Sequence, residues 1–177
     1  MIRQATIDDL AEILNLDESV SEVPLTKKQW EGYIADDVDV FVMHDLAGKL
    51  VGVAVGGYCE HPTFPTIEYI MKTVFVRDDC RKKSFGKLLV DEMKQSAISH
   101  NCNHMFCIVP EDWILENDDR NILGWLLNLD FKATQYTTDQ FQWYDRDNPG
   151  VIFTTELDRG NHGTVGSNQR ELSASVA

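Results

Sequence analysis

A strand, a short basic loop and a long helix follow one another in the middle of the chain, and this run most constrains the fold. Residues 67–76, IEYIMKTVFV, alternate like a strand, with Val74 and Val76 on one side. From Phe85 to Ala97, apolar residues recur at steps of three and four, which is typical of a helix packed on a sheet. The loop between them therefore forms the N-terminus of that helix.

Strand and helix patterns alternate along the rest of the chain as well. Short alternating or apolar runs bounded by turn residues predict strands, and longer runs with apolar residues at helical spacing predict helices. The resulting fold class is α/β, or mixed α+β, with helices flanking a mixed sheet. Strands are expected at residues 1–6, 39–45, 50–58, 104–109, 131–138 and 151–157, and helices at 7–19, 26–37 and 120–131.

One folded domain fits a length of 177 residues with 43% hydrophobic content. Residues 159–177 hold almost no large apolar side chains and many Gly, Ser and Asn, so we expect a domain at 1–158 and a polar flexible tail. The tail is a predicted contact with a second copy or another assembly component. No apolar run reaches the roughly 20 residues that cross a bilayer. The acidic N-terminus is unlike a signal peptide, so we expect a cytoplasmic protein.

The formal net charge of −13 argues against nucleic acid or an anionic membrane as a partner, because phosphate contacts need broad clusters of Lys and Arg. A cationic substrate suits the charge better, although charge also serves solubility alone. The four cysteines show no C-x-x-C spacing and the five histidines are scattered, so we predict no metal site and no disulfide framework.

The basic loop contains four cations in seven positions, from Arg81 to Lys87. A strand, a turn and a helix start present free backbone N–H groups and the positive end of a helix dipole, which together predict an anion site. A Walker A loop is excluded because Arg81 stands at its first Gly position and Leu88 follows Gly86-Lys87. The three glycines of the Rossmann fingerprint are missing too. A solvated surface loop is the alternative.

The segment VFVRDDCRKKSFGKLL resembles the cofactor motif of the GNAT family of acyl-CoA N-acetyltransferases. That motif runs apolar-x-apolar, a few polar residues, then [RQ]-x-x-G-x-[GA]. Arg81 falls on the Arg or Gln and Gly86 on the second Gly, while Ser84 replaces the first. The resemblance extends in order from residue 2 to about 157. It implies the GNAT fold, with a largely antiparallel sheet of about six or seven strands and about four helices.

The same resemblance implies acetyl-CoA as cofactor and an amine as acceptor. Backbone groups of Val74 and Val76 would hold the pantetheine arm, and the loop amides would hold the diphosphate. Asn117 lies near the place where many members carry an Asn that touches the cofactor. The cofactor residues implied are Val74, Val76, Arg81, Lys82, Lys83, Ser84, Phe85, Gly86, Lys87 and Asn117.

The acid and base of the reaction are less well matched. Glu68 lies at an even spacing from Val74, which predicts the same strand face and a role as general base. Ile70 occupies the family's commonest base position, so an edge carboxylate without catalytic function is the alternative. The family's usual tyrosine acid corresponds to Leu126, and Asp130 replaces a family Gly. Tyr136, Cys107 or an ordered water are the substitutes, and Tyr136 is our candidate acid.

Two functions remain open at this stage. The first is an acetyl-CoA-dependent N-acetyltransferase that moves the acetyl group directly to an amine of a small molecule, peptide or protein. The second is a catalytically weakened GNAT-like domain that serves as a binding or structural component of an assembly such as a viral particle. The departures at Leu126 and Asp130 and the polar tail favour the second function.

Overall fold

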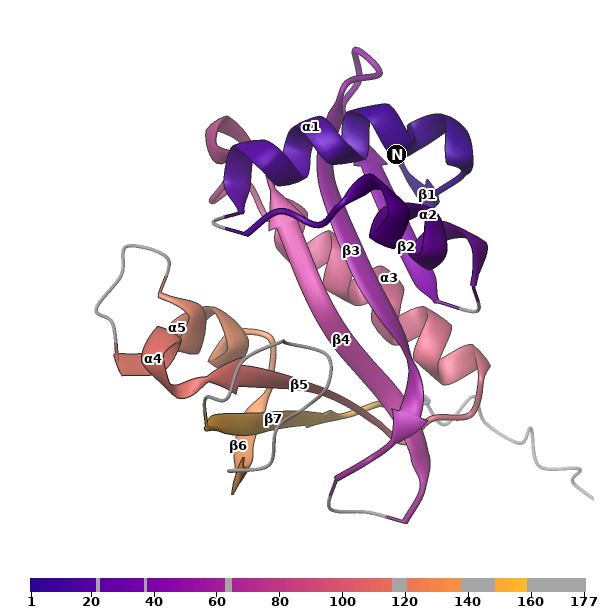
Figure 1. Ribbon diagram of the computed structural model, residues 1–177. Helices are drawn as coiled ribbons and strands as arrows, with labels where there is room; N and C mark the ends of the chain where they lie inside the picture. Colours follow the sequence, from indigo (N-terminus) through magenta and orange to yellow (C-terminus); the bar gives the residue numbers. More distant parts are fainter. Residues whose placement is uncertain (22, 37, 63–64, 116–120, 138–148, 159–177) are drawn as a thin grey trace, which may run out of the picture.

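The computed structural model describes residues 1–21, 23–36, 38–62, 65–115, 121–137 and 149–158 (Figure 1). The predicted tail at 159–177 and the candidate Asn117 lie outside the described residues.

A seven-stranded sheet forms the centre of the fold, in the order β1-β2-β3-β4-β5-β7-β6. Every described pair of neighbouring strands is antiparallel except β4 and β5, which are parallel. The predicted mixed, largely antiparallel sheet is therefore confirmed. The strands are β1 (Ile2–Gln4), β2 (Asp39–His44), β3 (Leu50–Glu60), β4 (Ile67–Val76), β5 (His104–Pro110), β6 (Lys132–Thr137) and β7 (Gly150–Glu156).

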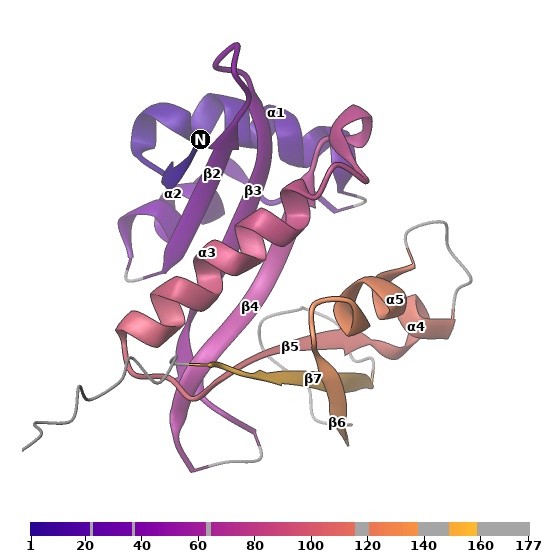
Figure 2. The same ribbon diagram turned by 180° about the vertical axis from the view of Figure 1, so that it is seen from behind.

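Helices cover both faces of the sheet. In Figure 1, α1 (Leu10–Val20) and α2 (Lys27–Ala35) lie in front of the half that contains β1 to β4, and Figure 2 shows α3 (Phe85–Ser99) across the other face. The short helices α4 (Glu111–Leu115) and α5 (Ile122–Leu127) lie near the end of β5. None of the described helices combines the length and apolar character needed to cross a bilayer.

Local sequence accounts for most of these elements. Thr26 caps α2, since its side chain accepts a hydrogen bond from the Gln29 amide and the Gln29 side chain accepts one from the Thr26 amide. Helix α4 lies between the predicted strand at 104–109 and the predicted helix at 120–131, where no helix is expected from the sequence. Helix α5 is also shorter than the predicted helix 120–131.

Two apolar layers fill the sheet's two faces. The α3 face contains Tyr69 and Met71 of β4 together with Leu89 and Met93 of α3. The opposite face, which α1 and α2 cover in part, contains separate clusters around Trp30 and around Ile70. The cluster members on the opposite face also include Ile13, Val53, Val55, Phe106, Ile108 and Ile152.

A β-bulge interrupts the ladder between β3 and β4. Thr73 pairs with Val55 and Met71 pairs with Gly56, so Lys72 is the extra residue of β4. The extra residue shifts the alternation of side chains, and both Met71 and Val74 pack on the α3 face. Our expectation that Glu68 shares a face with Val74 is therefore wrong. Glu68 is paired across the ladder with Cys59, which packs in the cluster of the opposite face.

The two parallel strands separate soon after they meet. Pairing between β4 and β5 is described for Tyr69 with Met105 and for Ile70 with Phe106, and beyond these residues the strands diverge (Figures 1 and 2). The amide of Arg77 donates to the Val51 carbonyl of β3 at 3.0 Å. Because backbone direction alternates along a strand, the polar backbone groups of residues 74 and 76 face the side from which β5 has departed.

Candidate active site

The loop that follows β4 has an unusual backbone at two positions. It begins with a 3₁₀ turn, Asp78–Cys80, and ends at Ser84, which precedes the first residue of α3. Lys82 and Ser84 have φ angles of 61° and 63°, in the left-handed region that glycine adopts most easily. The Ser84 side chain makes no capping hydrogen bond. Ser84 thus keeps a glycine-like backbone at the position where the GNAT motif has its first Gly.

Six consecutive amide groups, those of residues 82–87, have no hydrogen-bond acceptor among the described residues. The loop bonds end at Arg81, whose amide donates to the Asp78 carbonyl at 3.2 Å, and the helix bonds begin at Leu88, whose amide donates to the Ser84 carbonyl at 3.0 Å. Side chains from Lys82 to Ser84 are exposed. Clustered donors at the start of a 15-residue helix form a site suited to phosphate groups.

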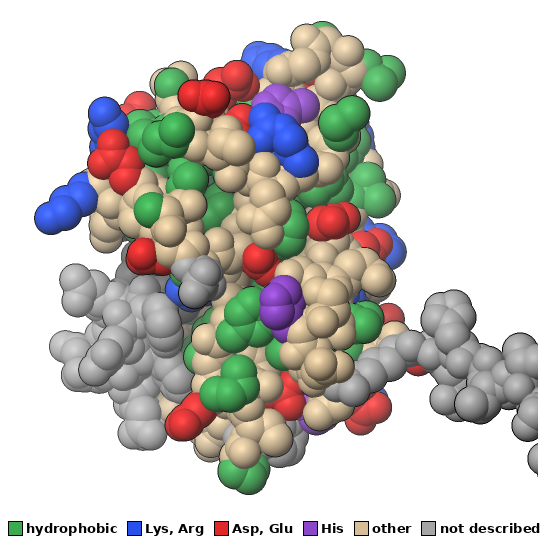
Figure 3. Space-filling view, turned by 90° about the vertical axis from the view of Figure 1, so that its right-hand side faces the viewer, with side chains coloured by type: hydrophobic (Ala, Val, Ile, Leu, Met, Phe, Trp, Pro, Cys, Tyr) green, Lys and Arg blue, Asp and Glu red, His purple; other side chains and the backbone are tan. Residues whose placement is uncertain are grey.

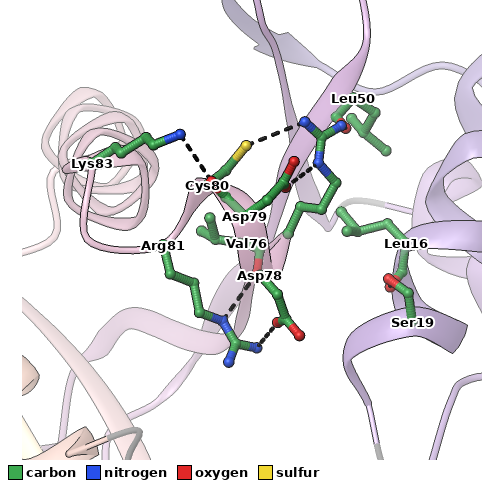
Figure 4. A network of polar contacts seen from close by, with 10 residues as sticks. Leu16, Ser19, Leu50, Val76, Asp78, Asp79, Cys80, Arg81 and Lys83 are labelled. Atoms are coloured by element: carbon green, nitrogen blue, oxygen red, sulfur yellow. Dashed lines mark hydrogen bonds and ion pairs between the residues drawn. The ribbon is translucent and has the colours of Figure 1, made fainter.

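Two of the loop's four cations, Arg81 and Lys83, are bound by neighbouring residues of the same turn, as Figure 4 shows. The Arg81 guanidinium lies 2.8 Å from an Asp78 carboxylate oxygen and also donates to the Val76 carbonyl at 3.4 Å. Lys83 donates to the Asp79 carbonyl at 2.9 Å. These contacts hold the turn in shape.

Two further lysines of the loop differ in their contacts. Lys87 pairs with Asp91 one helical turn later. Lys82 makes no such contact with any described residue, so its ammonium is free for a ligand. Elsewhere, on the face seen in Figure 3, the coloured basic side chains are scattered among acidic and apolar ones. The basic loop is thus a local positive site on an acidic protein.

Gly86 lies under the half-buried ring of Trp125 from α5. A Cβ added at Gly86 would lie 3.5 Å from the Trp125 ring, which is ordinary contact, and larger side chains would displace the ring. Phe85 packs into the core of the α3 face and anchors the helix start. Leu126, at the family's usual tyrosine position, is 1% exposed and belongs to the same core. Sequence reasoning missed Trp125 because the contact joins distant elements.

Glu68 lies at the far end of β4 from the basic loop and is 1% exposed. Its carboxylate accepts hydrogen bonds from the amides of Asn103 and His104, at 2.8 and 2.7 Å, and from the Thr66 hydroxyl at 2.9 Å. The His104 ring lies 3.3 Å away. These contacts join the start of β4 to the start of β5. The structure does not bring Glu68 together with the cofactor candidates, and its contacts suit a structural carboxylate.

Tyr136 lies on β6, two strands from β5 across the sheet, and is 52% exposed. Its hydroxyl donates to the carboxylate of Glu111, which follows β5, at 3.0 Å. Partial desolvation and the Glu111 carboxylate raise the pKa of Tyr136. Burial also raises the pKa of the Cys107 thiol. Neither residue contacts the basic loop in the described structure, so the role of Tyr136 stays a prediction.

Residues 7–122 match the model of the acetyltransferase (GNAT) family. The chain belongs to the GNAT family. An acetyltransferase of Photorhabdus laumondii is 26% identical over 164 residues, which cover 88% of this chain and 94% of the relative.

Solved structures show the same fold. NAA60 of Arabidopsis thaliana, in complex with acetyl-CoA, superposes with a TM-score of 0.70 at 11% identity and covers 89% of this chain and 98% of its own. A ribosomal-protein-alanine N-acetyltransferase from Brucella melitensis superposes with a TM-score of 0.63 at 18% identity, covering 89% and 99%. The GNAT fold predicted from the sequence is confirmed.

Acetyl-CoA is the cofactor of this family, and the residues of the basic loop fit it. The unpaired amides of residues 82–87 offer the donors that a diphosphate needs, and Lys82 adds a free positive charge. The backbone groups of Val74 and Val76 face the open side of β4, where an extended amide-containing arm can hydrogen-bond like an added strand.

We expect the Ser84→Gly variant to be more stable than the native protein by about 0.5–1 kcal/mol. Glycine removes the strain of a left-handed residue, and the larger freedom of the unfolded chain offsets part of the gain. Urea unfolding followed by circular dichroism measures this. Asn101 has a similar φ of 64° but lies outside the loop, so Asn101→Gly is a matched control for the change in stability. The Asn101→Gly substitution should leave the affinity for acetyl-CoA unchanged.

Proposed function

We propose that this protein is an acetyl-CoA-dependent N-acetyltransferase that moves the acetyl group directly to an amine. The observation that carries the proposal is the run of six unpaired amides at the start of α3, next to the open edge of β4. Family membership supports acyl transfer in general. Bound acetyl-CoA would supply an activated acetyl thioester.

The chain's own residues would bind and orient the two reactants. The loop amides and Lys82 would hold the diphosphate, and Val74 and Val76 would align the arm along β4. Leu126 and the surrounding core would exclude water from the α3 side. The charge of −13 supports an acceptor that is cationic as a whole. Solved neighbours include an enzyme named for a ribosomal-protein alanine, so peptide N-termini belong among the acceptors to test.

Thermal unfolding with and without acetyl-CoA tests the cofactor part of the proposal. A ligand present at a hundredfold its Kd adds about 2.7 kcal/mol of stability, which raises Tm measurably. Release of the free thiol is then followed with polyamines, amino acids and peptides with free N-termini. No Tm shift with either acetyl-CoA or CoA would contradict the proposal.

The alternative of a weakened domain within an assembly depends on Leu126, Asp130 and the tail. The comparisons with known proteins give it no support, and we do not propose it. Binding of acetyl-CoA without thiol release for any acceptor in the panel is the result that would revive it.

A further inference from the structure

Lys72 is the residue that the β-bulge adds to β4, and it lies where β4 and β5 part. Pairing with β5 is described up to Ile70, and the backbone groups of Val74 and Val76 face the side from which β5 has departed. Along β4, Lys72 therefore lies between the residues that pair with β5 and the residues whose backbone would hold the cofactor's arm. Bulges re-aim side chains and are frequent beside active sites.

The side chain of Lys72 lies on the face opposite α3. Its Nζ is 5.1 Å from the centre of the Tyr33 ring, which comes from α2. Cys59 of β3 packs against the apolar cluster that contains Ile70, and its thiol is near enough to influence the pKa of Lys72. A half-buried amine thus lies close to a phenol on the face of the sheet opposite α3, and a thiol on the same face influences its pKa.

Burial favours the uncharged form of each of these three groups. It lowers the pKa of Lys72, which the Cys59 thiolate would raise, and it raises the pKa of both Tyr33 and Cys59. A lysine accepts a proton only in its uncharged form, and a lowered pKa increases the fraction of that form at a given pH. Burial thus shifts Lys72 toward the uncharged amine, which is the form that can accept a proton.

The other candidates for this task are placed less well. Glu68 already accepts several hydrogen bonds at the far end of β4, and the Leu126 side chain has no group that can donate or accept a proton. Cys107 is buried in the α3-face core, and Tyr136 is bound to Glu111 on the far side of β5.

We propose that Lys72 is the proton-transfer residue of the acetyl transfer, an inference that rests on the proposed function. In its deprotonated form, the Lys72 amine accepts one proton from the ammonium of the acceptor and later passes it to solvent. The acceptor nitrogen then forms the C–N bond while the thioester C–S bond breaks. The nitrogen's second proton ends on the released thiol, so protons and electrons balance.

Two variants test the inference against a matched control. Lys72→Arg keeps the positive charge, but the guanidinium cannot lose its proton. Lys72→Met keeps an apolar side chain of similar length and removes the amine. We expect kcat/KM for the acceptor to fall about 100-fold or more in both. The control is Lys94→Met, because Lys94 is also half-buried, lies 5.6 Å from the Phe131 ring and has a pKa lowered by burial, but belongs to α3. Lys94→Met should leave kcat/KM per folded molecule unchanged.

The pH dependence separates a proton-transfer role from a structural one. We expect kcat/KM to rise with pH through a group whose pKa lies below the ordinary 10.5 of lysine. That rise must appear at the same pH for two acceptors whose own amine pKa values differ, and it must vanish in Lys72→Arg. Labelling of Lys72 with acetic anhydride as a function of pH, read by peptide mass spectrometry without cofactor, should give the same midpoint.

Each outcome decides the inference. A retained rate and pH profile in Lys72→Arg overturns it, as does stable acetylation of Lys72 by acetyl-CoA, since an acetylated lysine has no proton to exchange. The Tm shift with acetyl-CoA is measured on every variant. If the native protein shows no Tm shift with acetyl-CoA, the proposed function fails. If the Tm shift is normal but the rate of acetyl transfer does not depend on Lys72, this inference alone fails.

Discussion

We expect the Glu68→Gln variant to lose about 2–4 kcal/mol of unfolding free energy. The carboxylate accepts bonds from the amides of Asn103 and His104 and from the Thr66 hydroxyl, and hydrogen bonds to a buried charged group are worth about 1.5–3 kcal/mol each. Glutamine keeps one carbonyl oxygen but turns an NH₂ group toward some of these donors. Urea denaturation, with an unchanged m-value, measures the loss.

The effect should depend on pH in a defined direction. Burial alone would raise the pKa of Glu68, but the bonds from His104, Thr66 and Asn103 outweigh burial and hold the pKa below its ordinary 4.5. A lowered pKa in the folded state gives stability that is complete above pH 4.5 and is lost as the pH falls through the folded value. The difference between the native protein and Glu68→Gln should therefore shrink below pH 4.5.

Glu60→Gln is the matched control, because Glu60 is exposed at the end of β3 and the substitution removes the same charge. Its unfolding free energy should change by less than about 0.5 kcal/mol. In both variants, acetyl transfer per folded molecule should match the native protein. A Glu68→Gln variant that folds normally but no longer transfers acetyl groups would restore Glu68 as the general base.

Local patterns were enough to predict most of the fold. The strand alternation of β4 and the helical stripe of α3 each depend on residues close in sequence, and the Thr26 cap needs only its own turn. The strand, loop and helix also predict clustered amide donors, because a helix start leaves its first N–H groups unpaired whatever the side chains are. The site's backbone part could therefore be predicted from the sequence.

The bulge at Lys72 could not be predicted in this way. Its position depends on how β4 pairs with β3, and the sequence of β4 alone is compatible with unbroken alternation. An error of one residue in register reverses the face of every side chain beyond it. For that reason Glu68 lies on the face opposite the predicted one, and the sequence of β4 gives no signal that Lys72 is displaced.

Long-range partners explain the other differences. The amides that bind Glu68 come from residues 35 and 36 positions later, and Trp125 meets Gly86 across 39 positions. No local pattern reports such pairs. The ion pair of Arg81 with Asp78 is a different case, since a spacing of three residues across a turn was visible in the sequence and could have been recognised.

We expect the Lys82→Glu variant to bind acetyl-CoA about 10- to 100-fold more weakly than the native protein. Lys82 carries the loop's free ammonium, and a carboxylate there replaces attraction to a diphosphate with repulsion beside the unpaired amides. Isothermal titration at low and high salt measures the loss. Because charges at exposed positions are screened, the loss should be smaller at high salt.

Two controls decide whether the lost affinity comes from the diphosphate contact. Lys132→Glu changes the net charge equally at an exposed position of β6 and should leave acetyl-CoA affinity nearly unchanged. S-acetylpantetheine has the thioester and the arm but no diphosphate, so its turnover should be equal in Lys82→Glu and the native protein. If Lys82→Glu reduces the use of acetyl-CoA and of S-acetylpantetheine equally, the substitution has disturbed the loop itself, and the assignment of its amides to the diphosphate fails.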